Sequence, residues 1–166
     1  DFSRVERFSL DQWNADIAVG LTGAFLCAKI IGGALAAQKH GAIVNISSEY
    51  GMLAPDQRLY RKEGVPEDQQ PVKPVTYTVV KAGLHGLTLY LSTYWAGSGV
   101  RVNKLTRGGV ENGQRSDFPE PAASRIPLGR MAKAHEFQGA LLNLCTTASA
   151  ILTGANVVVD GGKSVW

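Results

Sequence analysis

Tyr77 and Lys81 are the residues whose types and spacing point most directly to chemistry. They stand four positions apart, so in a helix they share one face about a turn from each other. A free tyrosine is a poor acid or base near neutral pH, but a nearby ammonium group favours the phenolate. The pair is therefore a candidate proton donor and acceptor. An amphipathic tyrosine beside a solvated lysine has the same spacing, and that alternative stays open.

Ser48 is a second candidate because it follows a short apolar run, residues 42–46 (AIVNI). Such a run fits a buried parallel strand, and open parallel sheets bind ligands beyond the carboxyl ends of their strands. The hydroxyl of Ser48 can hold a carbonyl or alcohol oxygen while Tyr77 moves the proton, although a serine here is also typical of a simple turn. Hydride chemistry would need a cofactor, because no side chain carries a hydride.

The spacing of apolar residues predicts the elements that position these side chains. The predicted helices cover residues 10–35, 76–95 and 136–145, and the predicted strands cover residues 42–46, 100–105 and 155–160. Ser9 with Gln12 has the form of a capping box for the first helix, and Gly41 is expected to stop it. Helices that alternate with strands indicate an α/β fold with a parallel sheet and covering helices.

Length and charge narrow the class of protein. The chain has 166 residues, 45% of them apolar, which is enough for one core and too short for two ordinary domains. The net charge is +3 without a long basic run, so nucleic acid is not an expected partner. Residues 20–37 are apolar enough to raise a membrane helix, but Lys29, Gly32 and Gly33 fit a closely packed soluble helix better. We expect no membrane partner.

The cysteines and histidines give no sign of a metal site. Cys27 and Cys145 are isolated within apolar stretches, which predicts buried free thiols and a cytoplasmic protein. His40, His85 and His135 are scattered and lack partners at ligand spacing, so we expect them at the surface or at helix ends.

Residues 52–75 contain four prolines and many charges, which predicts a long loop inside the single domain of residues 1–166. Loops of this length are uncommon in compact domains and often act as lids or binding segments. Residues 58–73 are therefore a candidate lid over a substrate.

Several motifs together resemble a known family. VNISS with Ser48, the pair Tyr77 and Lys81, VRVN before a glycine turn, LTG and VVVDGG occur in this order between about residues 10 and 162. The arrangement resembles the carboxyl portion of the short-chain dehydrogenase/reductase family. The resemblance implies an incomplete Rossmann-type fold and hydride transfer between NAD or NADP and a carbonyl or alcohol substrate.

The resemblance also implies roles for individual residues. Ser48 would orient the substrate oxygen, Tyr77 would act as the acid and base, and Lys81 would hold the nicotinamide ribose. Gly108 and Val110 belong to a turn that resembles the loop whose backbone meets the nicotinamide carboxamide. The long first and second helices resemble those that pack between subunits, so a homodimer or homotetramer is expected.

A narrower resemblance concerns the substrate. The long loop before PVTYTVVKAG, with GGVENGQ, is similar to a subgroup that acts in bacterial surface-sugar and flagellin modification. It suggests a sugar-derived substrate.

Three features depart from the family pattern. The Gly-rich turn that binds the cofactor pyrophosphate precedes this portion in the family, and GLTGAF at residues 20–25 lies inside a helix and does not replace it. Gly20 stands where the family usually has an asparagine that holds a relay water, so Gly20→Asn is expected to raise turnover in a full-length enzyme. Arg107 replaces a proline and is either a solvated loop residue or a contact for a phosphate or acidic substrate.

Three interpretations remain open at this stage. The chain is part of an active oxidoreductase, or an inactive remnant that serves as an oligomerisation or binding module, or a portion whose cofactor-binding half exists in the protein but not in this sequence. An intact mass near 17.7 kDa would favour the remnant, for which we expect no NAD(H) or NADP(H) binding. The residue that selects NAD over NADP belongs to the absent half.

Overall fold

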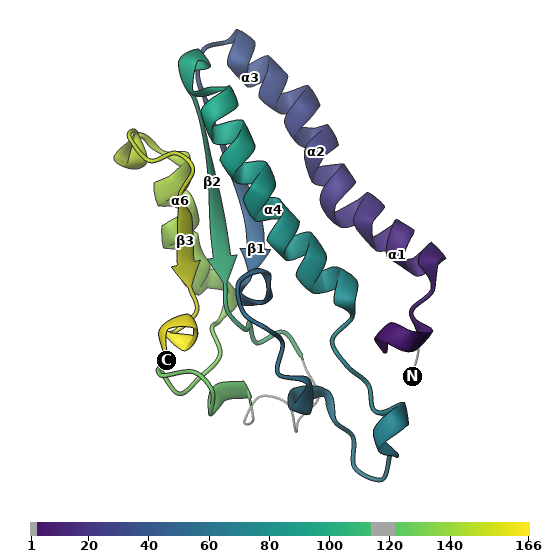
Figure 1. The fold of residues 1–166 in the computed structure, drawn as a ribbon. Coiled ribbons are helices and arrows are strands. Elements are labelled where there is room, and N and C mark those ends of the chain that lie inside the picture. The colour runs from purple at the N-terminus through teal and green to yellow at the C-terminus, as the bar shows by residue number, and fades with distance from the viewer. Residues whose placement is uncertain (1–2, 114–121) are drawn as a thin grey trace.

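A parallel sheet of three strands forms the centre of the molecule (Figure 1). The computed structural model describes residues 3–113 and 122–166. The strands are β1 (Gly41–Ser48), β2 (Val100–Arg107) and β3 (Asn156–Val159), in the order β1-β2-β3. Ser48, the last residue of β1, lies opposite Arg107, the last residue of β2. The predicted α/β fold with a parallel sheet is confirmed, and β1 and β2 each extend two residues beyond their predicted ends.

One long helical rod precedes the sheet. Its segments are α1 (Leu10–Ile17), α2 (Gly23–Cys27) and α3 (Gly33–Ala37), with π-helical turns at Ala18–Thr22 and Ala28–Gly32. Ser9 caps the rod by accepting a hydrogen bond from the backbone N–H of Gln12, at 3.1 Å. The side chain of Gln12 donates to Asp16 instead of returning to Ser9, so half of the predicted capping box forms. Gly41 does not stop the helix: Lys39 adopts the left-handed conformation (φ 56°), and Gly41 already belongs to β1.

Helix α4 (Val75–Tyr94) runs beside this rod and covers β1 and β2 (Figure 1). Pro74 precedes its first turn, where a missing N–H costs nothing. Helix α4 contacts the rod as well as the sheet, and a stripe of its residues at helical spacing is buried: Thr76, Val80, Leu84, Thr88 and Leu91. Tyr77 and Lys81 occupy the neighbouring stripe, so the packing of α4 sets their direction.

Helix α6 (Gln138–Cys145) contacts β1 and β2 and lies behind the sheet in Figure 1, where α4 lies in front. A 3-10 turn, Ala134–Phe137, leads into it. Helices therefore cover both faces of the sheet, as a parallel sheet requires.

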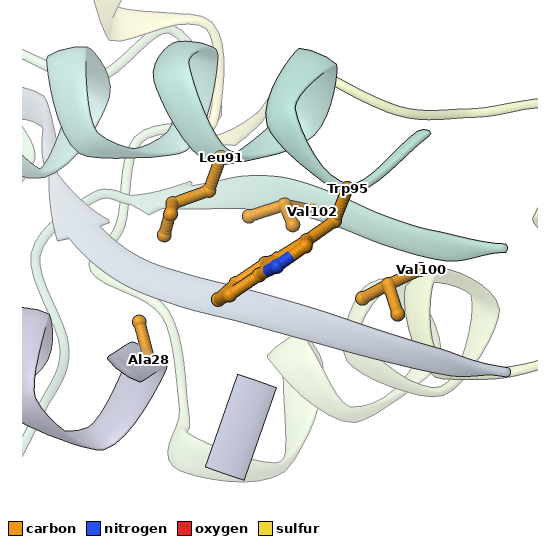
Figure 2. Close-up of a cluster of buried hydrophobic side chains, with 5 residues drawn as sticks. All are labelled: Ala28, Leu91, Trp95, Val100 and Val102. Atoms are coloured by element: carbon orange, nitrogen blue, oxygen red, sulfur yellow. The ribbon is translucent and has the colours of Figure 1, made fainter. Parts of the chain in front are cut away.

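The main apolar cluster lies at the end of the molecule where the strands begin. It consists of Ala28, Leu91, Trp95, Val100 and Val102 (Figure 2). The rod comes so near that a Cβ atom on Gly32 would lie 2.4 Å from the indole of Trp95. Gly32 therefore permits the close packing that was predicted for Gly32 and Gly33. A Cβ atom at Gly33 would meet nothing within 4 Å, so Gly33 does not serve this purpose.

Both cysteines contradict the sequence-based prediction of burial. Cys27 and Cys145 are free, but both are exposed. In each case the neighbouring residue, Ala28 or Leu144, is the one turned toward the core. An apolar sequence neighbourhood could not show which side of the helix a thiol occupies.

The histidines follow the prediction in part. His40 and His135 are exposed, as expected. His85 is half-buried in the middle of α4, and its Nδ1 atom is buried without a hydrogen-bond partner in the described chain. Within residues 3–113 and 122–166, no three His, Cys, Asp or Glu side chains gather as a metal site would need.

The rod is the one segment of the described chain that is long and apolar enough to cross a membrane. It spans Leu10–Ala37, and 11% of its most apolar 18-residue window is buried. Large apolar side chains lie exposed along it, including Val19, Phe25, Ile30 and Ile31.

Candidate functional site

Ser48 and Tyr77 both lie at the carboxyl edge of the sheet. Ser48 ends β1, and Tyr77 lies in the first turn of α4, which begins at the same edge. Both line a cavity of about 240 Å³, which we call the Ser48 cavity. The Ser48 hydroxyl is buried and accepts a hydrogen bond from the backbone N–H of Tyr50, at 3.4 Å. Parallel sheets bind ligands at this edge.

Lys81 is not among the residues that line the Ser48 cavity. With Asp16, Gly20 and Tyr77 it lines a second cavity, of about 420 Å³, which we call the Lys81 cavity. Its Nζ atom is 5.8 Å from the centre of the Tyr77 ring and donates to the carbonyl oxygen of Ile46, at 3.1 Å. Tyr77 is thus a shared wall: one cavity holds Ser48 and the other holds Lys81.

Lys73 is the last residue of the predicted lid, but the sequence indicated no role of its own for it at the site. Its Nζ atom lies 3.8 Å from the centre of the Tyr77 ring and 5.9 Å from that of Tyr60. Burial lowers the pKa of Lys73, and the charges of Arg107 and Lys81 lower it further. Burial and Arg107 lower the pKa of Lys81 in the same way. The spacing of four from Lys73 to Tyr77 was a signal, but Lys73 lies before the helix, where spacing does not fix direction.

Aromatic and ionic groups complete the Ser48 cavity. The rings of Tyr50 and Tyr77 meet edge to face, with centres 6.4 Å apart. Burial and a hydrogen bond with Tyr50 raise the pKa of Tyr60, which therefore stays neutral. Glu49 and Lys163 form an ion pair of 2.5 Å that is almost inaccessible to solvent. This pair ties the end of β1 to the segment after β3.

The long loop supplies part of the cavity wall through Leu59 and Tyr60, and the segment from Ala122 supplies another part. Asp56 joins the two walls by ion pairs of 2.8 Å to both Arg58 and Arg125. The hydrogen bond from Arg58 holds the pKa of Asp56 well below its usual range, so the link stays ionised at neutral pH. The role of this loop as a substrate lid stays a prediction.

Gly108 and Val110 also line the Ser48 cavity. The N–H of Gly108 donates to the carbonyl of Val159, and a Cβ atom at Gly108 would lie 2.8 Å from the Cα of Asp160. Val110 pairs with Ala132 in an isolated parallel bridge. The glycine is therefore needed for packing against the end of β3, whatever the turn binds.

Gly20 lies where the rod crosses α4. A Cβ atom there would come within 2.6 Å of a Val80 methyl group, and Val80 is buried. The sequence alone did not reveal this steric obstacle to Gly20→Asn, because the obstacle arises where two separate helices contact each other. An asparagine at position 20 would therefore press on the side chain of Val80 unless that side chain shifts or is made smaller.

Two parts of the chain match protein-family profiles. Residues 1–60 match the short chain dehydrogenase family, and residues 66–164 match the family described as enoyl-(acyl carrier protein) reductase. The chain belongs to the short-chain dehydrogenase/reductase family. The predicted family and its Rossmann-type fold are thereby confirmed.

The similar proteins include dehydrogenases and reductases. D-threitol dehydrogenase of Mycolicibacterium smegmatis is 33% identical over 165 residues, which are 96% of this chain and 57% of that enzyme. A short chain dehydrogenase of Leptospira borgpetersenii with bound NAD⁺ superposes with a TM-score of 0.86 at 31% identity, over 96% of this chain and 59% of that one. A gluconate 5-dehydrogenase of Burkholderia cenocepacia, in complex with NADP and tartrate, superposes with a TM-score of 0.84 at 27% identity. That comparison covers 98% of this chain and 60% of that one.

The chain therefore spans less than two thirds of the length of each of these relatives. Because the Leptospira comparison covers 96% of the chain, the Leu10–Ala37 rod is an element of the shared fold. The residues present fit a nicotinamide ribose: the Lys81 cavity presents an ammonium and a phenol, and Gly20 contributes no side chain to fill it.

Proposed function

We propose that this chain forms the substrate-binding and proton-transfer part of an NAD(P)-dependent oxidoreductase that interconverts an alcohol and a carbonyl. The observation that carries the proposal is the position of Tyr77 between two cavities, with Ser48 in one and Lys81 in the other. A proton-transfer group has to reach the substrate and remain under the influence of a charge. Tyr77 lines the cavity in which we place the substrate, and the Lys81 ammonium is 5.8 Å from its ring centre, which supports this role.

Ser48 and Tyr77 act on one oxygen atom of the substrate. The Ser48 hydroxyl accepts the N–H of Tyr50 and keeps its own proton for a hydrogen bond to that oxygen. Tyr77 removes the proton from the alcohol, or returns it to the carbonyl oxygen, through its phenolic oxygen. Lys81 holds its ammonium beside the ring and, across the second cavity, binds the ribose. Bound NAD or NADP supplies or accepts the hydride.

The substrate is proposed to be a small polyhydroxylated compound. The supporting facts are the tyrosine hydroxyls of the Ser48 cavity and the similarity to D-threitol dehydrogenase. A role in surface-sugar or flagellin modification rests on the loop and GGVENGQ motifs and stays a prediction, as does a cytoplasmic location.

An oligomerisation module is the second candidate. Apolar side chains lie exposed along the rod, including Phe25, Ile30 and Ile31, and Tyr90 and Tyr94 stack on the exposed side of α4. Association of two copies through these helices would bury them. A homodimer or homotetramer is compatible with catalysis, so this candidate replaces the first only if turnover is absent.

The variant Tyr77→Phe tests the proposed reaction. We expect turnover of sugar alcohols and of acidic sugar derivatives with NAD⁺ or NADP⁺ to fall by about 100-fold to 10,000-fold, because the group that moves the proton is lost. The measurement is the rate at which NAD⁺ or NADP⁺ is reduced. The protein is used in the form that its gene encodes, and its intact mass is determined first. Tyr90→Phe, on the exposed part of the same helix, is the matched control. Equal turnover in the two variants would refute the role of Tyr77.

A further inference from the structure

Lys73 and Arg107 bring positive charge into the Ser48 cavity without an acidic partner. Both line the cavity, and within residues 3–113 and 122–166 neither forms an ion pair. The contacts of Lys73 are aromatic rings, and Arg107 donates from Nη1 to the carbonyl of Gly108, at 3.3 Å. Glu49, the acidic residue of the same wall, is already paired with Lys163.

The two charges repel each other and Lys81. Arg107 and Lys81 both act on Lys73, and Arg107 acts on Lys81. Three cations gathered around one phenol, partly withdrawn from water, are unfavourable unless an anion joins them. Arginine in particular offers a planar fork that matches two oxygens of a carboxylate or phosphate.

These charges lie beside the proposed reacting groups. Lys73 covers the face of the Tyr77 ring, and Arg107 lies opposite Ser48 in the register of β1 and β2. An oxyacid held by the two cations would therefore share the cavity of about 240 Å³ with the oxygen that Ser48 and Tyr77 contact.

We propose that Lys73 and Arg107 bind an anionic oxygen group of the substrate, a carboxylate or a phosphate, so that the substrate is an acidic sugar derivative. This inference rests on the proposed function, because it places the substrate in the Ser48 cavity. It makes Lys73 and Arg107 specificity-determining residues that select against neutral sugar alcohols.

Calorimetric titration with three matched compounds tests the proposal. D-gluconate, D-glucitol 6-phosphate and D-glucitol share a polyhydroxylated chain and differ in the charged group. We expect one of the two anions to bind at least about tenfold more tightly than D-glucitol at low salt, since a charge-assisted hydrogen bond contributes roughly this factor. The anion that binds identifies the group as carboxylate or phosphate. Equal affinities for all three compounds would overturn the proposal.

Charge variants locate the effect. Lys73→Gln and Arg107→Gln should each weaken binding of the preferred anion by about tenfold, and Lys73→Arg should retain it. Lys62→Gln removes a positive charge from an exposed position in the same loop and should leave the affinity unchanged. A loss in Lys62→Gln equal to that in Lys73→Gln would show an effect of net charge alone and would refute the site.

Nicotinamide mononucleotide, which carries a phosphate on its ribose, tests whether the charges serve the cofactor. If Lys73→Gln and Arg107→Gln weaken binding of this nucleotide but not of the sugar anions, the proposal is wrong. The titrations need no turnover. Tyr77→Phe should therefore abolish catalysis and keep the preference for an anion, which separates a failure of this inference from a failure of the proposed function.

Discussion

The two ends of α4 differ in the residues that surround them. At its carboxyl end, Leu91 and the adjoining Trp95 are buried against Val100, Val102 and Ala28 (Figure 2). At its amino end, Tyr77 lies between cations, and the first turn contains no acidic residue. A helix amino terminus carries partial positive charge, so Lys73, two residues before α4, is unfavourably placed for stability. The contrast indicates that the apolar end fixes the helix and that the polar end is arranged for a ligand.

Removal of Trp95 should have the largest effect on the apolar end. We expect Trp95→Ala to lower the free energy of unfolding by about 3–5 kcal/mol, because a large aromatic side chain leaves a cavity in the core. Urea denaturation followed by circular dichroism measures the change. Tyr94→Ala, at a position that is 65% exposed, should cost far less. Similar losses in the two variants would contradict the assignment of Trp95 as the anchor of α4.

The collision between Gly20 and Val80 tests the amino end. Gly20→Asn should lower the free energy of unfolding by about 1–3 kcal/mol, as overpacking does. Combined with Val80→Ala, the same substitution should cost less than the sum of the two single changes, because the smaller side chain makes room. Thermal unfolding of all four proteins gives this coupling. Strict additivity would show that the two positions do not meet.

Lys104 lies in the middle of β2, one of the strands that α4 covers. It is 0% exposed, and its Nζ atom has no hydrogen-bond partner in the described chain. Burial lowers its pKa from the ordinary value of 10.5. The unfolded chain therefore binds this proton more readily, so the penalty is present at neutral pH and disappears as the pH rises toward 10.5.

Lys104→Met should accordingly stabilise the protein by about 1 kcal/mol at pH 7, with the gain shrinking at alkaline pH. Denaturation of both proteins between pH 7 and 10 measures it. Lys133→Met, at an exposed position, is the control. A destabilised Lys104→Met variant at pH 7 would mean that the ammonium has a favourable partner.

Local patterns predicted the helices, the strands and the residues Ser48, Tyr77 and Lys81, because each depends on periodicity or on a motif within one segment. Other features depend on how segments meet. Lys73 reaches Tyr77 through the path of an irregular loop, Gly20 meets Val80 between two helices, and Cys27 faces solvent because Ala28 takes the core position. Residue spacing within one segment does not predict contacts between separate segments.

Tyr77 and Lys73 each border both cavities. A molecule bound in one cavity therefore changes the electric field in the other cavity. It also changes the rotamers of Tyr77 and Lys73 that are available to a second molecule there. For the nucleotide and the sugar that we propose, thermodynamic reciprocity then applies: the factor by which the nucleotide changes the affinity for the sugar equals the factor by which the sugar changes the affinity for the nucleotide. Any cooperativity between the two cavities would therefore pass through the side chains of Tyr77 and Lys73.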